Sequence, residues 1–169
     1  MNMRLLIMRH AEAENSSLVD FNRTLSPNGL EEAKKAAVFL QDHQIDKIIS
    51  SYVKRTMQTS NIIMQDIPAI ELEMVTEFYE GTIEEIFELL SQQSDLHKNI
   101  LLVGHNPLIH QLVLSLTSKE DRYYSDVSDS TMETAQLIMI EFPELFDWQN
   151  IKPGSGNIIE IFIPDKNYK

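Results

Sequence analysis

Residues 4–10 read Arg-Leu-Leu-Ile-Met-Arg-His, a short apolar run that ends in two basic side chains. An apolar run of this length, followed by polar residues, is typical of a buried strand. It is too short for the core of a secretory signal or for a membrane span. We therefore expect the chain to begin with a buried strand that presents Arg9 and His10 at its carboxyl end.

Similar patterns recur along the rest of the chain. Apolar or alternating runs predict further strands at residues 47–50, 70–75, 99–103, 135–142 and 157–163. Helices are predicted between them, over residues 27–40, 53–65, 83–90 and 107–116. The side chains expected to face inward from the first two helices are Leu30, Ala33, Ala37, Leu40, Met57 and Ile62 or Ile63.

Capping residues indicate where these helices begin. Ser26 precedes Pro27, so a favoured N-cap comes before a favoured first helical residue. Thr82 is the expected N-cap of the third helix. Asn106, which precedes Pro107, is the expected N-cap of the fourth helix.

Strands that alternate with helices predict an α/β fold: a single three-layer α/β/α domain over residues 1–169 with a mostly parallel central sheet. The last two predicted strands follow one another closely, which allows an antiparallel pairing at one edge. Residues 119–131 have no clear period and are expected to form a loop, a candidate flap over an active site.

Composition excludes several classes of function. Apolar residues make up 43% of the 169-residue chain and charged residues 24%, as in ordinary globular domains. Without cysteine, the chain has no disulfides, no thiolate nucleophile and no cysteine zinc site. A formal net charge of −12 argues against nucleic-acid binding, and no run is apolar enough to span a membrane. We expect a cytoplasmic protein with neither kind of partner.

Basic side chains follow three of the predicted strands. Arg9 and His10 follow the first, Arg55 lies shortly after the second, and His105 and Asn106 follow the strand at 99–103. The carboxyl ends of parallel strands meet at one edge, where ligands usually bind. Arginine forks and imidazole donors suit the three charged oxygens of a phosphoryl group in transfer, and Asn106 is a further candidate phosphate ligand. The chain has no glycine-rich phosphate loop, which argues against an ATPase.

Several motifs together resemble a known family. They are Met8-Arg9-His10-Ala11, Asp20…Arg23-Thr24-Leu25…Gly29, Ser50-Ser51…Arg55…Gln58-Thr59, Val103-Gly104-His105-Asn106-Pro107 and Pro153-Gly154-Ser155-Gly156. In this order they resemble the histidine phosphatase superfamily, with its phosphoglycerate mutase-like fold, and within it the short SixA-type phosphohistidine phosphatases. The resemblance covers nearly the whole chain.

This resemblance implies a role for each matching residue. His10 matches the nucleophile that becomes phosphorylated, and Arg9 and Arg55 match the arginines that clamp the phosphate. His105 matches the second pocket histidine, which donates to phosphoryl oxygens, and Arg23 matches an arginine that also faces the pocket. Members of the family act without a metal, so the resemblance implies neither a metal site nor a cofactor.

The general acid is open at this stage. Larger members of the family carry a pocket glutamate after the third strand, where this chain has Glu77 and Glu80. Both are candidates, and both also suit an ordinary exposed helix face. Short members often lack an equivalent residue, and a phosphoramidate needs less help because its imidazole can leave once protonated.

The resemblance favours a hydrolase that removes phosphate from phosphohistidine on a partner protein, with inorganic phosphate as product. The alternative is a phosphatase for small metabolites or phosphosugars that uses the same site. A mutase is disfavoured because it needs a closed pocket, and a non-catalytic phosphate-binding module because His10, Arg9, Arg55 and His105 are all present. If residues 119–130 cover the pocket, a small substrate is favoured.

Overall fold

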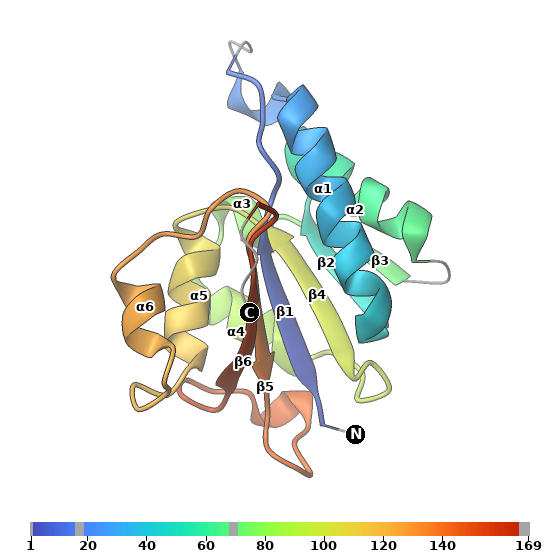
Figure 1. The fold of residues 1–169 in the computed structure, drawn as a ribbon. Coiled ribbons are helices and arrows are strands. Elements are labelled where there is room, and N and C mark those ends of the chain that lie inside the picture. The colour runs from blue at the N-terminus through green and yellow to red at the C-terminus, as the bar shows by residue number, and fades with distance from the viewer. Residues whose placement is uncertain (1, 16–18, 68–70, 166–169) are drawn as a thin grey trace.

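Six strands form the central sheet in the computed structural model, which describes residues 2–15, 19–67 and 71–165 (Figure 1). They are β1 (Arg4–Arg9), β2 (Lys47–Ser51), β3 (Glu71–Val75), β4 (Asn99–Gly104), β5 (Leu137–Glu141) and β6 (Asn157–Phe162). Their order across the sheet is β3-β2-β4-β1-β5-β6. The first four strands in this order pair in parallel, and β5 pairs antiparallel with β1 and with β6. The predicted mostly parallel sheet with an antiparallel edge is confirmed.

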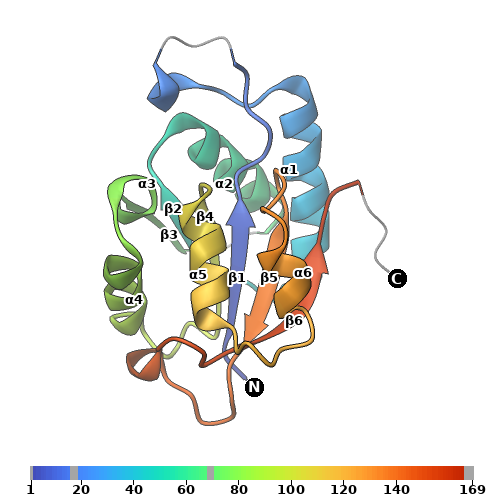
Figure 2. The ribbon, with the colours of Figure 1, turned by 90° about the vertical axis from the view of Figure 1, so that its left-hand side faces the viewer.

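Helices cover both faces of this sheet (Figures 1 and 2). They are α1 (Pro27–Leu40), α2 (Lys54–Asp66), α3 (Glu77–Glu80), α4 (Ile83–Ser91), α5 (Leu108–Leu116) and α6 (Tyr124–Ser128). Short 3₁₀ helices are η1 (Asp20–Asn22), η2 (Gln41–His43) and η3 (Trp148–Asn150). The pair α1 and α2 lies on one face, and α4, α5 and α6 lie on the other, which gives three layers. No helix in the described part of the chain is long and apolar enough to cross a bilayer.

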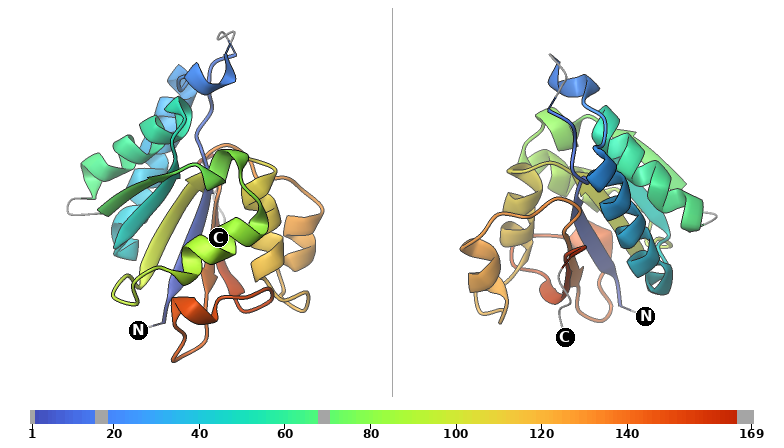
Figure 3. Two further views of the ribbon diagram at one scale, coloured as in Figure 1. Left: turned by 180° about the vertical axis from the view of Figure 1, so that it is seen from behind. Right: turned by 45° about the horizontal axis from the view of Figure 1, so that its top comes forward.

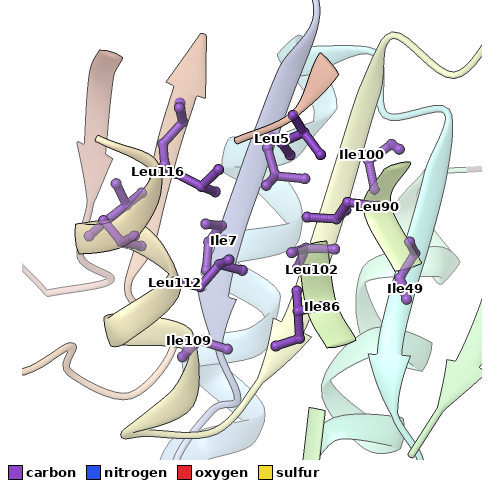
Figure 4. Packing of buried hydrophobic residues seen from close by; sticks show 14 of the residues in the cluster. Leu5, Ile7, Ile49, Ile86, Leu90, Ile100, Leu102, Ile109, Leu112 and Leu116 are labelled. Carbon is purple, nitrogen blue, oxygen red and sulfur yellow. The ribbon is translucent and has the colours of Figure 1, made fainter. Parts of the chain in front are cut away.

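Side chains of β1 alternate between two hydrophobic cores. Leu5 and Ile7 pack with residues of α4 and α5, as Figure 4 shows, whereas Leu6 and Met8 pack with residues of α1 and α2. All four side chains are fully buried. The four consecutive apolar residues inside β1 follow from its place between two helical layers, because each face of the strand needs a core.

Two of the predicted N-caps are present and one is not. The Ser26 side chain accepts a hydrogen bond from the backbone N–H of Gly29 at 3.0 Å, and Thr82 forms a capping box with Glu85. Asn106 does not cap α5, whose N-cap is Pro107. The Asn106 side chain is committed elsewhere, since its Nδ2 donates to the carbonyl of Met132 at 2.9 Å.

The predicted inward faces were partly wrong. Leu30 and Met57 are 38% and 40% exposed, although Ala33, Ala37, Leu40 and Ile63 are buried as expected. In α1 the inward face is rotated toward Gly29 and Glu32, because this end of the helix packs closely on the chain that follows β1. Ile70, predicted to start the third strand, lies outside the described residues.

Two other segments differ from the prediction. The strand predicted over 135–142 begins at Leu137, because Ala135 has a left-handed backbone conformation with φ of 53°. The stretch 119–131 contains α6 and is not a loop throughout. This short helix contacts α5, where Nε2 of His110 donates to the carbonyl of Val127 at 2.8 Å.

Candidate active site

A cavity of about 680 Å³ lies at the carboxyl ends of β1, β2 and β4. Its lining is Arg9, His10, Glu12, Ala13, Glu14, Asn15, Arg23, Ser26, Arg55, His105, Asn106 and Thr134. The right-hand view of Figure 3 brings this end of the sheet forward and shows the chain between β1 and α1 rising above it. The predicted nucleophile His10 and all five residues predicted to bind phosphate are in this lining.

Backbone contacts fix the position of His10. Its N–H donates to the carbonyl of Gly104 at 3.0 Å, and its own carbonyl accepts from the N–H of Ala135 at 3.2 Å. Its Nδ1 lies 2.7 Å from the carbonyl oxygen of Ala11. Because a carbonyl oxygen only accepts, Nδ1 carries the ring proton and Nε2 holds the free lone pair. Nε2 accepts from Nε of Arg55 at 3.2 Å.

The surroundings keep this imidazole neutral. Burial, together with the charges of Arg55, Arg9 and Arg23, lowers the pKa of His10 from 6.5 to about 4, against the opposing effect of its hydrogen bond to Ala11. At neutral pH the ring is therefore an unprotonated nucleophile held in a single tautomer.

We expect an NMR titration of the free protein to place the midpoint of the His10 ring near pH 4. The unfolded chain takes up this proton near pH 6.5 and the folded chain does not. His10 should therefore contribute a fall of about 3 kcal/mol in the free energy of unfolding as the pH drops from 6.5 to 4, and no further loss below that. His105, whose pKa is lowered to about 3, adds a loss of its own over the same range. Denaturant titrations across this range measure the loss, and a His10 midpoint near 6.5 would contradict the expectation.

His105 faces His10 across the cavity, with ring centroids 5.1 Å apart. Its Nε2 is 3.0 Å from the Ser51 hydroxyl. Burial and the nearby charges of His10 and Arg55 lower the pKa of His105 to about 3, so this ring is also neutral. Its Nδ1 is buried without a hydrogen-bond partner among the described residues, as are Nε of Arg9 and Oδ1 of Asn106. A tetrahedral oxyanion could supply acceptors for the first two of these atoms.

Residues 132–136, directly before β5, support the site, and the sequence did not predict this role. The carbonyl of Met132 accepts from Nη1 of Arg9 and from Nδ2 of Asn106, both at 2.9 Å. The carbonyl of Gln136 accepts from the N–H of Arg9, and the N–H of Ala135 bonds to His10. These are mostly backbone groups, which every residue carries, so the sequence holds no signal for them.

Asp20 is the residue most closely tied to Arg55. Nη1 of Arg55 donates to the carbonyl oxygen of Asp20 at 2.8 Å, and Nη2 donates to its carboxylate Oδ2 at 2.9 Å. The same carboxylate accepts from the Tyr79 hydroxyl at 3.0 Å and from Arg23 at 3.3 Å. Burial acts to raise the pKa of Asp20, but the hydrogen bonds from Arg55, Tyr79 and Arg23 outweigh it, so the pKa is lowered.

The two glutamates considered as general acids are not part of the described cavity lining. Both belong to α3, in which Glu77 is half-buried and Glu80 is exposed. Tyr79, between them, faces the site instead, with its ring centroid 5.5 Å from that of His105. The carboxylates in the lining are Glu12 and Glu14, which the sequence did not single out because both precede the recognised Asp20 motif.

Residues 119–130 are absent from the described lining of this cavity. They lie beside α5, and several of them border a different cavity near β6. The cavity lining therefore gives no support to this segment as the candidate flap. Among the described residues, no three histidine, aspartate or glutamate side chains are grouped as a metal ion requires.

The chain is similar to known histidine phosphatases both in sequence and in structure. The profile of the histidine phosphatase superfamily (branch 1) matches residues 5–97. The phosphohistidine phosphatase SixA homolog of Haemophilus influenzae is 28% identical over 134 residues, covering 70% of this chain and 80% of that protein. The structure of SixA from Nakamurella multipartitia has a TM-score of 0.83 at 22% identity, covering 98% of both chains. A protein histidine phosphatase SixA complexed with tungstate has a TM-score of 0.77 at 22% identity, covering 96% of this chain and 97% of that chain.

Proposed function

Because the chain belongs to the histidine phosphatase superfamily and is a phosphatase, we propose that it removes phosphoryl groups from phosphohistidine side chains of a partner protein. The observation that carries the proposal is the buried, neutral His10, whose Nε2 lone pair faces a cavity lined by Arg9, Arg23 and Arg55. This is a nucleophile beside three cations, in a chain whose overall net charge is −12. It suits a phosphoryl group and little else.

In the first step of the proposed reaction, the lone pair of His10 Nε2 attacks phosphorus. The new N–P bond forms as the bond from phosphorus to the leaving imidazole nitrogen breaks. That electron pair stays on the leaving nitrogen, and because the other nitrogen of that ring already carries a proton, a neutral imidazole departs. Arg9 and Arg55 bind the phosphoryl oxygens as charge develops on them. His105 donates to a third oxygen through Nδ1, if Nε2 accepts from the Ser51 hydroxyl.

In the second step, water attacks phosphorus and the bond to His10 breaks. The electron pair returns to Nε2, and both protons of the water leave with the phosphate as dihydrogen phosphate, which passes one of them to solvent according to the pH. Two smaller barriers replace one large one. Throughout, the Ala11 carbonyl keeps the proton on Nδ1, so that Nε2 is the nitrogen that both attacks and leaves.

The carboxylates near the site favour a phosphoramidate over an ordinary ester. An alkoxide needs a proton donor to leave, and the lowered pKa of Asp20 keeps that carboxylate ionised at neutral pH. Glu77 and Glu80, the two candidates for a general acid, are outside the described cavity lining. A protonated imidazole leaves without such help, which supports phosphohistidine as the substrate.

The cavity mouth also favours a substrate carried by a protein. Residues 119–130, whose position would favour small substrates if they covered the site, are absent from its described lining. The Tyr79 ring, 5.5 Å from that of His105, belongs to a group of three aromatic rings, with Phe21 5.1 Å from Tyr52 and 6.5 Å from Tyr79. Flat rings of this kind offer a stacking surface for a planar leaving imidazole. The likeness to proteins named as SixA phosphohistidine phosphatases supports the same substrate.

Parallel assays on a phosphohistidine peptide and a phosphate monoester test this function. We expect kcat/KM for the peptide to exceed that for the monoester by about a hundredfold, which corresponds to one well-placed proton donor that the ester lacks here. Phosphate release over time gives both rates, and the same assays on a small phosphosugar complete the comparison. A higher rate on the phosphosugar would move the function to small metabolites, and binding without turnover would reduce the protein to a phosphate-binding module.

A further inference from the structure

Every nitrogen of the Arg55 guanidinium already has an acceptor in this structure. Nε donates to Nε2 of His10, Nη1 to the carbonyl oxygen of Asp20, and Nη2 to the Asp20 carboxylate. The Arg55 side chain is 6% exposed, whereas that of Asp20 is 49% exposed. The arginine is therefore enclosed, and the carboxylate is the member of the pair with room to move.

This arrangement occupies the atom that must react. Nδ1 of His10 is bonded to Ala11, so Nε2 has the only lone pair in the ring plane, and the N–H of Arg55 points at it. In-line attack on phosphorus needs that lone pair. The hydrogen bond between Arg55 and His10 must break before the chemistry begins, and Arg55 needs new acceptors in the same place.

We propose that Asp20 is a positioning residue that holds Arg55 against His10 in the free enzyme and is displaced from Arg55 by the phosphoryl oxygens of the substrate. This inference rests on the proposed function. The phosphoryl group supplies the acceptors that Asp20 and His10 give up, and the freed lone pair of Nε2 then faces phosphorus. The affinity of the site for a phosphoryl group is accordingly reduced by the free energy of the Asp20–Arg55 contact.

Partners for the displaced carboxylate are already in place. The Tyr79 hydroxyl bonds Oδ2 of Asp20 from α3, and Nη1 of Arg23 bonds Oδ1 from the chain that leads to α1. Both donors can keep the carboxylate after it has separated from Arg55, so its charge is not left unpaired. Asp20 starts η1, in the connection that rises above the sheet at the top of Figure 1.

Calorimetric titration with orthophosphate tests the displacement, using Asp20→Asn and the matched control Glu14→Gln. Glu14 lines the same cavity, but within the described residues no hydrogen bond or ion pair joins its carboxylate to Arg55. Each variant removes one negative charge next to the anion site. We expect Asp20→Asn to bind orthophosphate about tenfold more tightly than the wild type, and Glu14→Gln less than about twofold, because only the first weakens a contact that phosphate must replace.

A ¹⁵N NMR spectrum of the free proteins gives a second measurement. The Nε2 resonance of His10 should shift in Asp20→Asn toward that of a ring without a hydrogen bond and stay in place in Glu14→Gln. Weaker phosphate binding by Asp20→Asn, or equal gains in both variants, would overturn the displacement while the proposed function stands. Failure of the wild type to bind orthophosphate at all would overturn both.

Discussion

Replacing His10 with alanine is expected to reduce turnover of a phosphohistidine peptide by at least about a thousandfold. The substitution removes the nucleophilic Nε2 while leaving Arg9 and Arg55 to bind the phosphoryl group, so binding should survive where turnover does not. The backbone of position 10 bonds to Gly104 and Ala135, and alanine keeps both bonds, so the pairing of β1 with β4 should remain intact. Initial rates of phosphate release measure the loss, and circular dichroism checks the fold.

His110→Ala is the matched control for this prediction. His110 lies on α5 and bonds the carbonyl of Val127, outside the described lining of the cavity. Its loss should leave kcat within about twofold of the wild type. Quenching the wild type during turnover should also trap an acid-labile, base-stable phosphoryl label on the protein, which His10→Ala does not acquire. Comparable rates in His10→Ala and the wild type would contradict the proposed mechanism.

Replacing Gly29 with alanine is expected to lower the free energy of unfolding by about 3 kcal/mol. A Cβ added at this position would lie 1.9 Å from the carbonyl oxygen of Glu12 and 2.8 Å from its carbonyl carbon. Both are backbone atoms, so no side-chain rotation relieves the overlap, and α1 must move away from the chain that follows β1. For a domain of this size the midpoint of thermal unfolding should fall by roughly 6–12 °C.

The same substitution should also lower activity, because the crowded backbone is two residues from His10. Glu12 follows Ala11, whose carbonyl orients the His10 ring. The control is Leu30→Ala on the next residue of the same helix, where the side chain is 38% exposed and the cost should be about 0.5 kcal/mol. Denaturant unfolding of the two variants provides the comparison. A Gly29→Ala variant as stable as Leu30→Ala would show that α1 can shift without cost.

The sequence predicted those parts of the fold that depend on local patterns. The apolar run of β1 identified the central strand, and Ser26 and Thr82 marked helix starts because each cap is a bond between neighbouring residues. It placed Leu30 and Met57 on the wrong faces, because the inward direction of a helix is decided by what packs against it. From the spacing of apolar side chains alone, the predicted inward face of a helix can be displaced by about one residue position.

The candidate site also contains residues that the sequence could predict and residues that it could not. Residues that follow strand ends, such as His10 and His105, could be brought together from the strand order alone. The role of Asp20 could not, because its bond to Arg55 joins residues 35 positions apart through a turn whose path has no pattern in the sequence. Glu77 and Glu80 were considered because family members have an acid nearby, but α3 presents Tyr79 toward the cavity instead.

The carbonyl of Met132, which holds both Arg9 and Asn106, has a consequence for how this protein can vary over evolutionary time. Any amino acid at position 132 supplies the same carbonyl oxygen, so the hydrogen bonds to Arg9 and Asn106 depend on the backbone path and not on the side chain there. An exposed neighbour such as Thr131 can then change in sequence while the arginine keeps its position. The stretch from α6 to β5 can thus acquire new surface chemistry, including contacts to new partners, without redesign of the catalytic centre.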